Sequence, residues 1–89
     1  MISRTTKRFP KCFSELPPDI QERAREAYAR FQNDPQHPGL RFKLVHTEAD
    51  VYSVRVSRDF RALGAREEDL IVWFWIGSHS DYEKLLKDL

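Results

Sequence analysis

The chain has 89 residues, of which 40% are hydrophobic, and a formal net charge of only +1. This length predicts a single domain spanning residues 1–89, and the hydrophobic fraction argues against disorder. Cys12 is the only cysteine, which excludes a disulfide framework and a four-cysteine metal site. The opening residues contain no apolar signal, and the longest apolar run, Ile71–Ile76, is far shorter than the roughly 20 residues that span a bilayer. We therefore expect a cytoplasmic protein with no membrane association.

The charges are unevenly distributed along the chain. Residues 1–13 carry four basic side chains and no acidic one, a local charge of +4. Residues 65–89 carry three basic and six acidic side chains, a local charge of −3. A surface that binds nucleic acid would therefore have to be local, because the chain as a whole is not basic.

The first half of the chain predicts a short strand followed by a helical hairpin. Phe9, Cys12, Phe13 and Leu16 have the spacing of one helix face, and Pro17-Pro18 ends that helix. A second amphipathic helix is expected from Asp19 to about Asn33, where turn-forming residues follow. Its buried face is predicted to contain Ile20, Ala24, Ala27, Tyr28 and Phe31.

The second half changes to the two-residue period of strands. Alternation predicts strands over residues 40–44, 52–56 and 60–63, joined by short polar connections. Ile71–Ile76 is apolar on both faces, which indicates a central strand covered on both sides, with Trp73 and Trp75 in the core. Ser80 and Glu83 have the spacing of a capping box for a last helix, whose buried side is expected to contain Tyr82, Leu85, Leu86 and Leu89.

These elements predict an α+β fold, in which an N-terminal strand and a helical hairpin pack on a curled antiparallel sheet and a short C-terminal helix follows. The strand alternation places Lys43, Arg55 and Arg61 on the sheet face that points away from the hairpin. This placement depends on parity, because a slip of one residue moves a side chain to the other face.

The residue types on that face suit phosphate chemistry. Arg55 and Arg61 can present forked donors to phosphate oxygens, and His79, just before the last helix, can transfer protons near neutral pH. The alternative interpretation is structural: solvated arginines, a histidine bonded to the backbone, and Tyr82 serving in packing. The sequence contains no HExxH, CxxC or P-loop motif, so we expect neither a metal nor a cofactor.

The same residues resemble the RelE/ParE toxin superfamily of type II toxin–antitoxin systems. The resemblance covers nearly the whole chain in order. It consists of the leucine–proline break, the helix that ends in Asn-Asp-Pro, and the segments Leu40-Arg41-Phe42-Lys43, Tyr52-Ser-Val-Arg55, Phe60-Arg61-Ala62-Leu63 and Gly77-Ser-His79-Ser-Asp-Tyr82. The resemblance implies the same α+β fold and a cognate antitoxin, acidic and partly disordered before it binds.

The resemblance implies two different activities and leaves the choice between them open. The RelE-like activity is a metal-independent, ribosome-associated mRNA endonuclease, for which Arg61 and Arg55 would hold the phosphate, His79 would act as general acid or base, and Tyr82 and Lys43 would assist. The ParE-like alternative is a non-enzymatic inhibitor of DNA gyrase. A third possibility is an inactive member that is retained as a binding partner.

Overall fold

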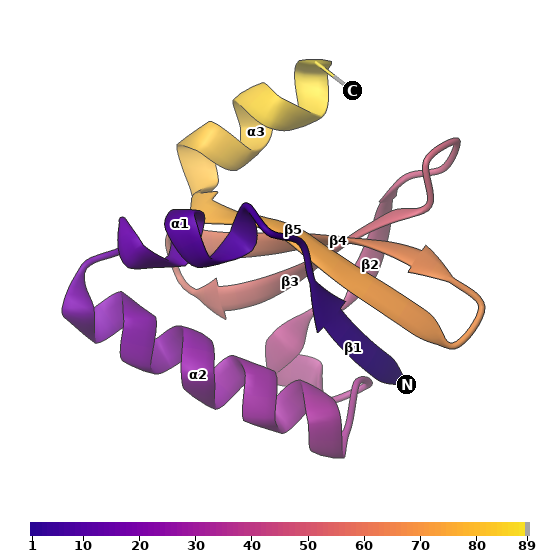
Figure 1. The fold of residues 1–89 in the computed structure, drawn as a ribbon, viewed down its shortest axis with the longest axis horizontal. Helices are drawn as coiled ribbons and strands as arrows, with labels where there is room; N and C mark the ends of the chain where they lie inside the picture. The colour runs from indigo at the N-terminus through magenta and orange to yellow at the C-terminus, as the bar shows by residue number, and fades with distance from the viewer. Residues whose placement is uncertain (89) are drawn as a thin grey trace.

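The computed structural model describes residues 1–88 and contains one sheet and three α-helices (Figure 1). In chain order the elements are β1 (Ile2–Thr5), α1 (Phe9–Ser14), α2 (Pro18–Asn33), the 3₁₀ helix η1 (Pro38–Leu40), β2 (Lys43–His46), β3 (Val51–Ser57), β4 (Phe60–Glu67), β5 (Leu70–Ser78) and α3 (His79–Asp88). The predicted order of strand, two helices, strands and terminal helix is confirmed.

The five strands form one sheet in the order β1-β5-β4-β3-β2. Strands β2 to β5 make the expected antiparallel meander. Strand β1 lies at the opposite edge and pairs with β5 in parallel, with Ile2 opposite Leu70. The helical hairpin follows β1 immediately and lies on one face of the sheet, as α1 and α2 do in Figure 1.

The hairpin buries its apolar stripe against that face. Phe31 of α2 is 2% exposed and makes edge-to-face ring contacts with Phe42 and Trp73, at centroid distances of 5.0 and 5.3 Å. Ala24 and Ala27 are also buried, as expected. Tyr28 is not, since 39% of its surface is exposed.

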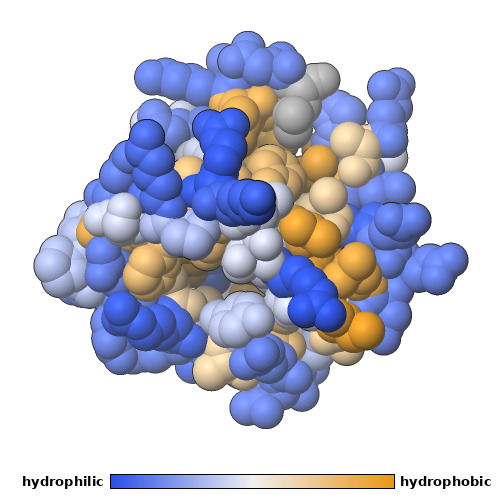
Figure 2. Space-filling view, viewed as in Figure 1, coloured by the Kyte–Doolittle hydropathy of each residue, from blue (hydrophilic) through white to orange (hydrophobic). Residues whose placement is uncertain are grey.

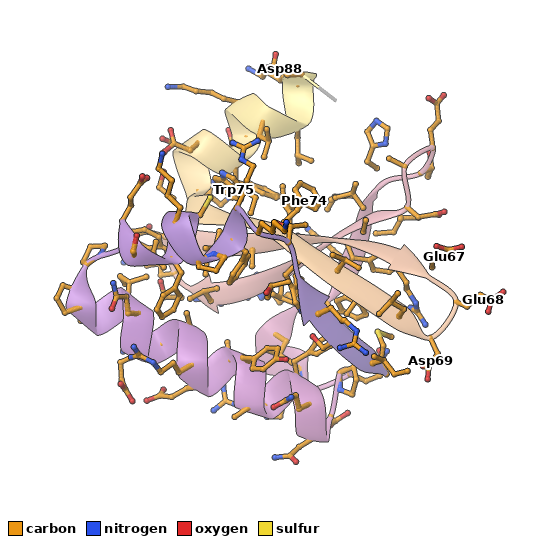
Figure 3. All side chains as sticks on the ribbon, in the orientation of Figure 1. Glu67, Glu68, Asp69, Phe74, Trp75 and Asp88 are labelled. Atoms are coloured by element: carbon orange, nitrogen blue, oxygen red, sulfur yellow. The ribbon has the colours of Figure 1, made fainter. Side chains whose placement is uncertain are left out.

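The opposite face of the sheet is covered by α3, which lies across the sheet from α2 in Figure 1. A second core cluster forms there from Val51, Leu63 and Tyr82. Phe74 and Trp75 pack against this cluster, and Figure 3 shows both between β5 and α3. The expectation that β5 is covered on both sides is therefore confirmed, whereas Leu89 lies outside the described residues.

Two boundaries differ from the sequence-based expectation. The strand predicted from Leu40 begins only at Lys43, because η1 ends at Leu40 and Arg41 adopts a left-handed conformation with φ of 47°. The terminal helix begins at His79, and its first turn is capped by Ser78, whose Oγ accepts a hydrogen bond of 3.2 Å from the Asp81 amide. The cap is thus two residues earlier than the predicted Ser80.

Two register shifts interrupt the pairing of the strands. Leu44 is exposed, and Trp75 packs on the opposite face of the sheet from Trp73. Leu44 is 42% exposed on the edge strand β2, opposite Tyr52, and the register between β2 and β3 shifts after it. A second shift leaves Phe74 without a partner residue on β4, so that Phe74 and Trp75 both pack on the α3 side. Trp73 stays in the hairpin-side core, 4% exposed. Such shifts are β-bulges, which move the following side chains relative to the partner strand.

We expect Gly64→Ala to destabilise the fold by about 1–3 kcal/mol, as overpacking in a filled core does. A Cβ at residue 64 would lie 2.7 Å from Trp73 Cε3 and 2.8 Å from Ile71 Cγ1, and both side chains are buried. Urea denaturation measures the loss. Gly39→Ala is the control, since its Cβ would meet only the His37 ring at 3.3 Å. Equal stability of the two variants would contradict the packing argument.

Candidate functional site

The predicted cationic residues lie on one face of the sheet, on the side away from the helical hairpin. Arg55 of β3 is directly opposite Arg61 of β4, and Lys43 of β2 is opposite Ser53 of β3. Residues two apart on a strand share a face, so Lys43 and Arg55 point the same way. Lys43 lies one row along the sheet from the Arg55–Arg61 pair.

Arg61 is held in place by the turn that connects β3 to β4. Its Nη1 donates hydrogen bonds to the carbonyl oxygens of Ser57 at 2.7 Å, Phe60 at 2.9 Å and Arg58 at 3.3 Å. All hydrogen bonds that Arg61 makes within residues 1–88 use Nη1, so Nε and Nη2 remain for an anion. Burial, and then the positive charge of Arg55, lower the pKa of Arg61. A bound anion would replace the water that burial removes from the guanidinium group, and it would offset the repulsion between Arg61 and Arg55.

Arg41 affects the electrostatics of Arg61 and was not among the predicted site residues. Its positive charge lowers the pKa of Arg61, after burial and the charge of Arg55. The left-handed backbone at Arg41 turns the chain from η1 into β2. The signal in the sequence was its position two residues before Lys43, which gives it the same parity.

His79 stands at the start of α3, beside the same turn. Its amide donates a hydrogen bond of 2.7 Å to the Asp59 carbonyl, which fixes the helix start to the β3–β4 connection. The imidazole is 41% exposed, and its Nδ1 lies 3.2 Å from Glu83 Oε1. The Glu83 contact occupies Nδ1, so Nε2 is the nitrogen that can meet a substrate.

Tyr82 connects the histidine with the arginines. Its ring centroid lies 5.5 Å from that of His79, and it interacts electrostatically with Arg61. Only 7% of Tyr82 is exposed, because its ring packs in the cluster with Val51 and Leu63. Tyr82 therefore has a packing role and also lies within the predicted site.

Gly77 and Trp75 form the part of the sheet next to Arg61. Gly77 is opposite Arg61 in the pairing of β4 with β5. A Cβ at residue 77 would lie 2.6 Å from Trp75 Cζ2, so the indole ring lies over the backbone where a side chain would otherwise stand. Trp75 packs against the second core cluster, as predicted, and its half-buried ring also lies next to the backbone opposite Arg61.

In a comparison with models of known protein families, the model for the ParE-like toxin domain matches residues 18–84, which is most of the chain. The chain belongs to the ParE-like toxin domain family. The resemblance to the RelE/ParE toxin superfamily is thereby confirmed.

Solved structures of toxins share the fold of this ParE-like domain. A chain of the RelB–RelE antitoxin–toxin complex from Methanococcus jannaschii has a TM-score of 0.74 and 17% identity, over 92% of this chain and 96% of that one. YafQ from E. coli has a TM-score of 0.71 and 9% identity, over 90% and 94%. The isolated E. coli RelE toxin has a TM-score of 0.65 and 15% identity, over 99% and 98%. A comparison with curated protein sequences finds no match.

The ParE-like domain thus brings some predicted residues together and leaves others apart. Arg55, Arg61, Tyr82 and His79 gather around the β3–β4 turn and the start of α3. Lys43 shares their face but lies in the next row. Within residues 1–88, no group of three His, Cys, Asp or Glu residues is arranged to hold a metal ion. No helix in the described part is long and apolar enough to cross a membrane.

Proposed function

We propose that this ParE-like domain is the toxin of a type II toxin–antitoxin pair and acts as a metal-independent, ribosome-associated mRNA endonuclease. The observation that carries the proposal is the cross-strand pair of Arg55 and Arg61 next to a partly exposed histidine. Two neighbouring guanidinium groups repel one another, and an anion between them offsets this repulsion. A phosphodiester is an anion whose oxygens match the guanidinium fork.

The chemistry that this arrangement supports is transfer of the phosphoryl group to the neighbouring 2′-oxygen of the ribose. A general base takes the 2′-OH proton, the 2′-oxygen forms a bond to phosphorus, and the bond from phosphorus to the 5′-oxygen breaks. A general acid gives the leaving 5′-oxygen a proton, so that the products are a 2′,3′-cyclic phosphate and a 5′-hydroxyl. Arg61, with Arg55 and Arg41, stabilises the charge that develops on the phosphorane oxygens.

His79 is the residue to which we assign proton transfer, through Nε2. Its ring is accessible, and Glu83 orients it at Nδ1. Tyr82 assists by fixing the position of the His79 ring, because its own ring is packed in the core. Lys43 assists from the next row by attracting the RNA backbone.

We further propose that the partner of this toxin is an acidic antitoxin, because a chain of the RelB–RelE antitoxin–toxin complex from Methanococcus jannaschii shares its fold. An apolar cavity of about 250 Å³ lies between the hairpin and the sheet, with Phe9, Phe13 and Tyr28 among its lining residues. Figure 2 shows hydrophobic residues at the surface of this face of the molecule, among hydrophilic ones. The basic residues of the first 13 positions lie on the segment that leads into α1, which suits an acidic partner.

Induced expression followed by mapping of message 5′ ends tests the proposed reaction. We expect new 5′ ends within translated messages, carrying a hydroxyl group because the leaving 5′-oxygen is protonated. Treatment of the purified toxin with a chelator that removes zinc and other transition metals, at the magnesium concentration that the ribosomes need, should leave cleavage intact. Growth arrest with all messages uncut would contradict the proposal.

Gyrase inhibition is the second candidate, and the ParE-like family match favours it. The exposed residue that would serve such a contact is Tyr28, at the mouth of the apolar cavity in the hairpin. A supercoiling assay with purified gyrase and a reporter of DNA damage separate the two activities. Inhibition of supercoiling that depends on Tyr28 and not on His79 would establish this candidate.

A further inference from the structure

A polar cavity of about 260 Å³ lies between α2 and the edge of β3, outside the arrangement around His79. Strand β2 pairs with β3 only over residues 51–53, so the second half of β3 has no neighbouring strand on that side. Helix α2 and Gly39 of η1 border the cavity on that side instead. The lining residues are Arg23, Glu26, Ala27, Arg30, Gly39, Arg55, Val56, Ser57 and Arg58.

The cavity contains an excess of positive charge. Four of its lining residues are arginines, and Glu26 is the only acidic one. Arg23, Glu26 and Arg30 share one side of α2, since they are spaced at i, i+3 and i+7. Arg58 comes from the β3–β4 turn, on the other side of the space.

These charges are not neutralised by the part of the chain that the structure describes. The ion pairs within residues 1–88 join Arg25 to Glu22, His79 to Glu83, and the terminal amine to Asp69, and they include none of the cavity arginines. Glu26 is the only carboxylate among the lining residues, so the four arginines leave an excess of positive charge that favours a bound anion. Forked donors from several directions suit a tetrahedral phosphate group.

Arg55 links this cavity to the site around Arg61. It lines the cavity and is also the cross-strand neighbour of Arg61. A strand of RNA whose phosphate faces Arg61 could continue across the β3 edge and place another phosphate between Arg23, Arg30 and Arg58. The Arg55–Arg61 pair and the cavity therefore lie on one continuous basic path.

We propose that this cavity binds a second phosphodiester of single-stranded RNA, on the far side of Arg55 from the scissile phosphate. This inference rests on the proposed endonuclease function and names the path of its substrate. The contact is to the phosphate backbone, so it contributes affinity and position without base preference.

The test measures binding of a 2′-O-methyl RNA oligonucleotide, which cannot be cleaved at the 2′-oxygen, by fluorescence anisotropy across a salt series. We expect the double variant Arg23→Ala/Arg30→Ala to bind more weakly. Its slope of log affinity against log salt should be shallower by about 0.7, the value for one lost single-strand phosphate contact. The control is Lys84→Ala/Lys87→Ala, which removes the same charge from exposed positions of α3 and should keep the slope of the wild type.

A third variant tests the sign of the effect. Glu26→Gln removes the only carboxylate of the cavity at an exposed helix position and should tighten RNA binding. Equal slopes for the two double variants and the wild type would overturn the inference. So would a double variant that loses affinity for a poly-glutamate peptide and keeps it for RNA, because the cavity would then serve an acidic protein segment.

The two proposals fail separately. If no cleavage is found but the arginine variant changes the salt slope, the phosphate site stands and the nuclease falls. If cleavage is found and the slope does not change, the nuclease stands and the cavity has no part in binding RNA.

Discussion

Replacement of His79 by asparagine is expected to lower the rate of message cleavage by about 10²–10⁴, the usual loss when one general acid or base is removed. Asparagine has a similar size and can still accept or donate a hydrogen bond, but it cannot exchange a proton near neutral pH. The backbone bond from residue 79 to Asp59 and the Ser78 cap do not depend on the side chain. Single-turnover cleavage of a labelled message on purified ribosomes measures the rate.

His37→Asn is the matched control for this prediction. His37 lies in the turn before η1, where its Nδ1 accepts a hydrogen bond of 3.1 Å from the Gly39 amide. An asparagine oxygen can accept the same bond, so this variant should fold and cleave like the wild type. If His79→Asn cleaves as fast as His37→Asn, histidine 79 transfers no proton and the proposed mechanism is wrong.

The fold was predictable because its local signals agree with one another. The hairpin follows from apolar spacing and from the proline pair, and the meander follows from alternation and short polar turns. The pairing of β1 with β5 was not predictable, since four residues do not specify a partner strand. The shift at Phe74 was also hidden, because it arises from how β4 and β5 fit together around Gly64.

The site was predictable only in part. Parity correctly placed Lys43, Arg55 and Arg61 on one face. Arg41, whose charge acts on Arg61, was missed because it lies in the left-handed connection before β2 and not on a strand. The cavity between α2 and β3 was missed for another reason: Arg23 and Arg30 look like solvated helix residues until the helix is packed against the sheet.

The polar tip of the β4–β5 hairpin shows why net charge alone was a poor guide. Glu67, Glu68 and Asp69 point away from the body of the molecule in Figure 3. They lie on another part of the fold than the Arg55–Arg61 pair, which flanks the β3–β4 turn at the opposite ends of β4 and β5. The chain has a net charge of +1, yet this acidic tip and the arginine pair lie in different parts of the fold.

Replacement of Arg61 and of Arg55 by alanine is expected to abolish growth arrest in both cases, but to change stability in only one. Arg61 makes three hydrogen bonds to carbonyl oxygens of the turn, whereas none is found for Arg55 among the described residues. A hydrogen bond to a charged group contributes about 1.5–3 kcal/mol. Arg61→Ala should therefore lower the free energy of unfolding by a comparable amount, while Arg55→Ala should leave it near the wild-type value. Urea denaturation and growth assays measure the two effects.

Arg61→Lys separates the two roles of this residue. Lysine keeps the positive charge and can donate to one or two of the turn carbonyls, so it should restore much of the stability that alanine loses. Its single nitrogen, Nζ, cannot hold the turn and also present a planar fork of donors to a phosphate. We therefore expect a stable protein that still cleaves messages far more slowly than the wild type. A lysine variant with full activity would mean that Arg61 acts only through its charge or only through the turn, and that the phosphate is held by Arg41 and Arg55.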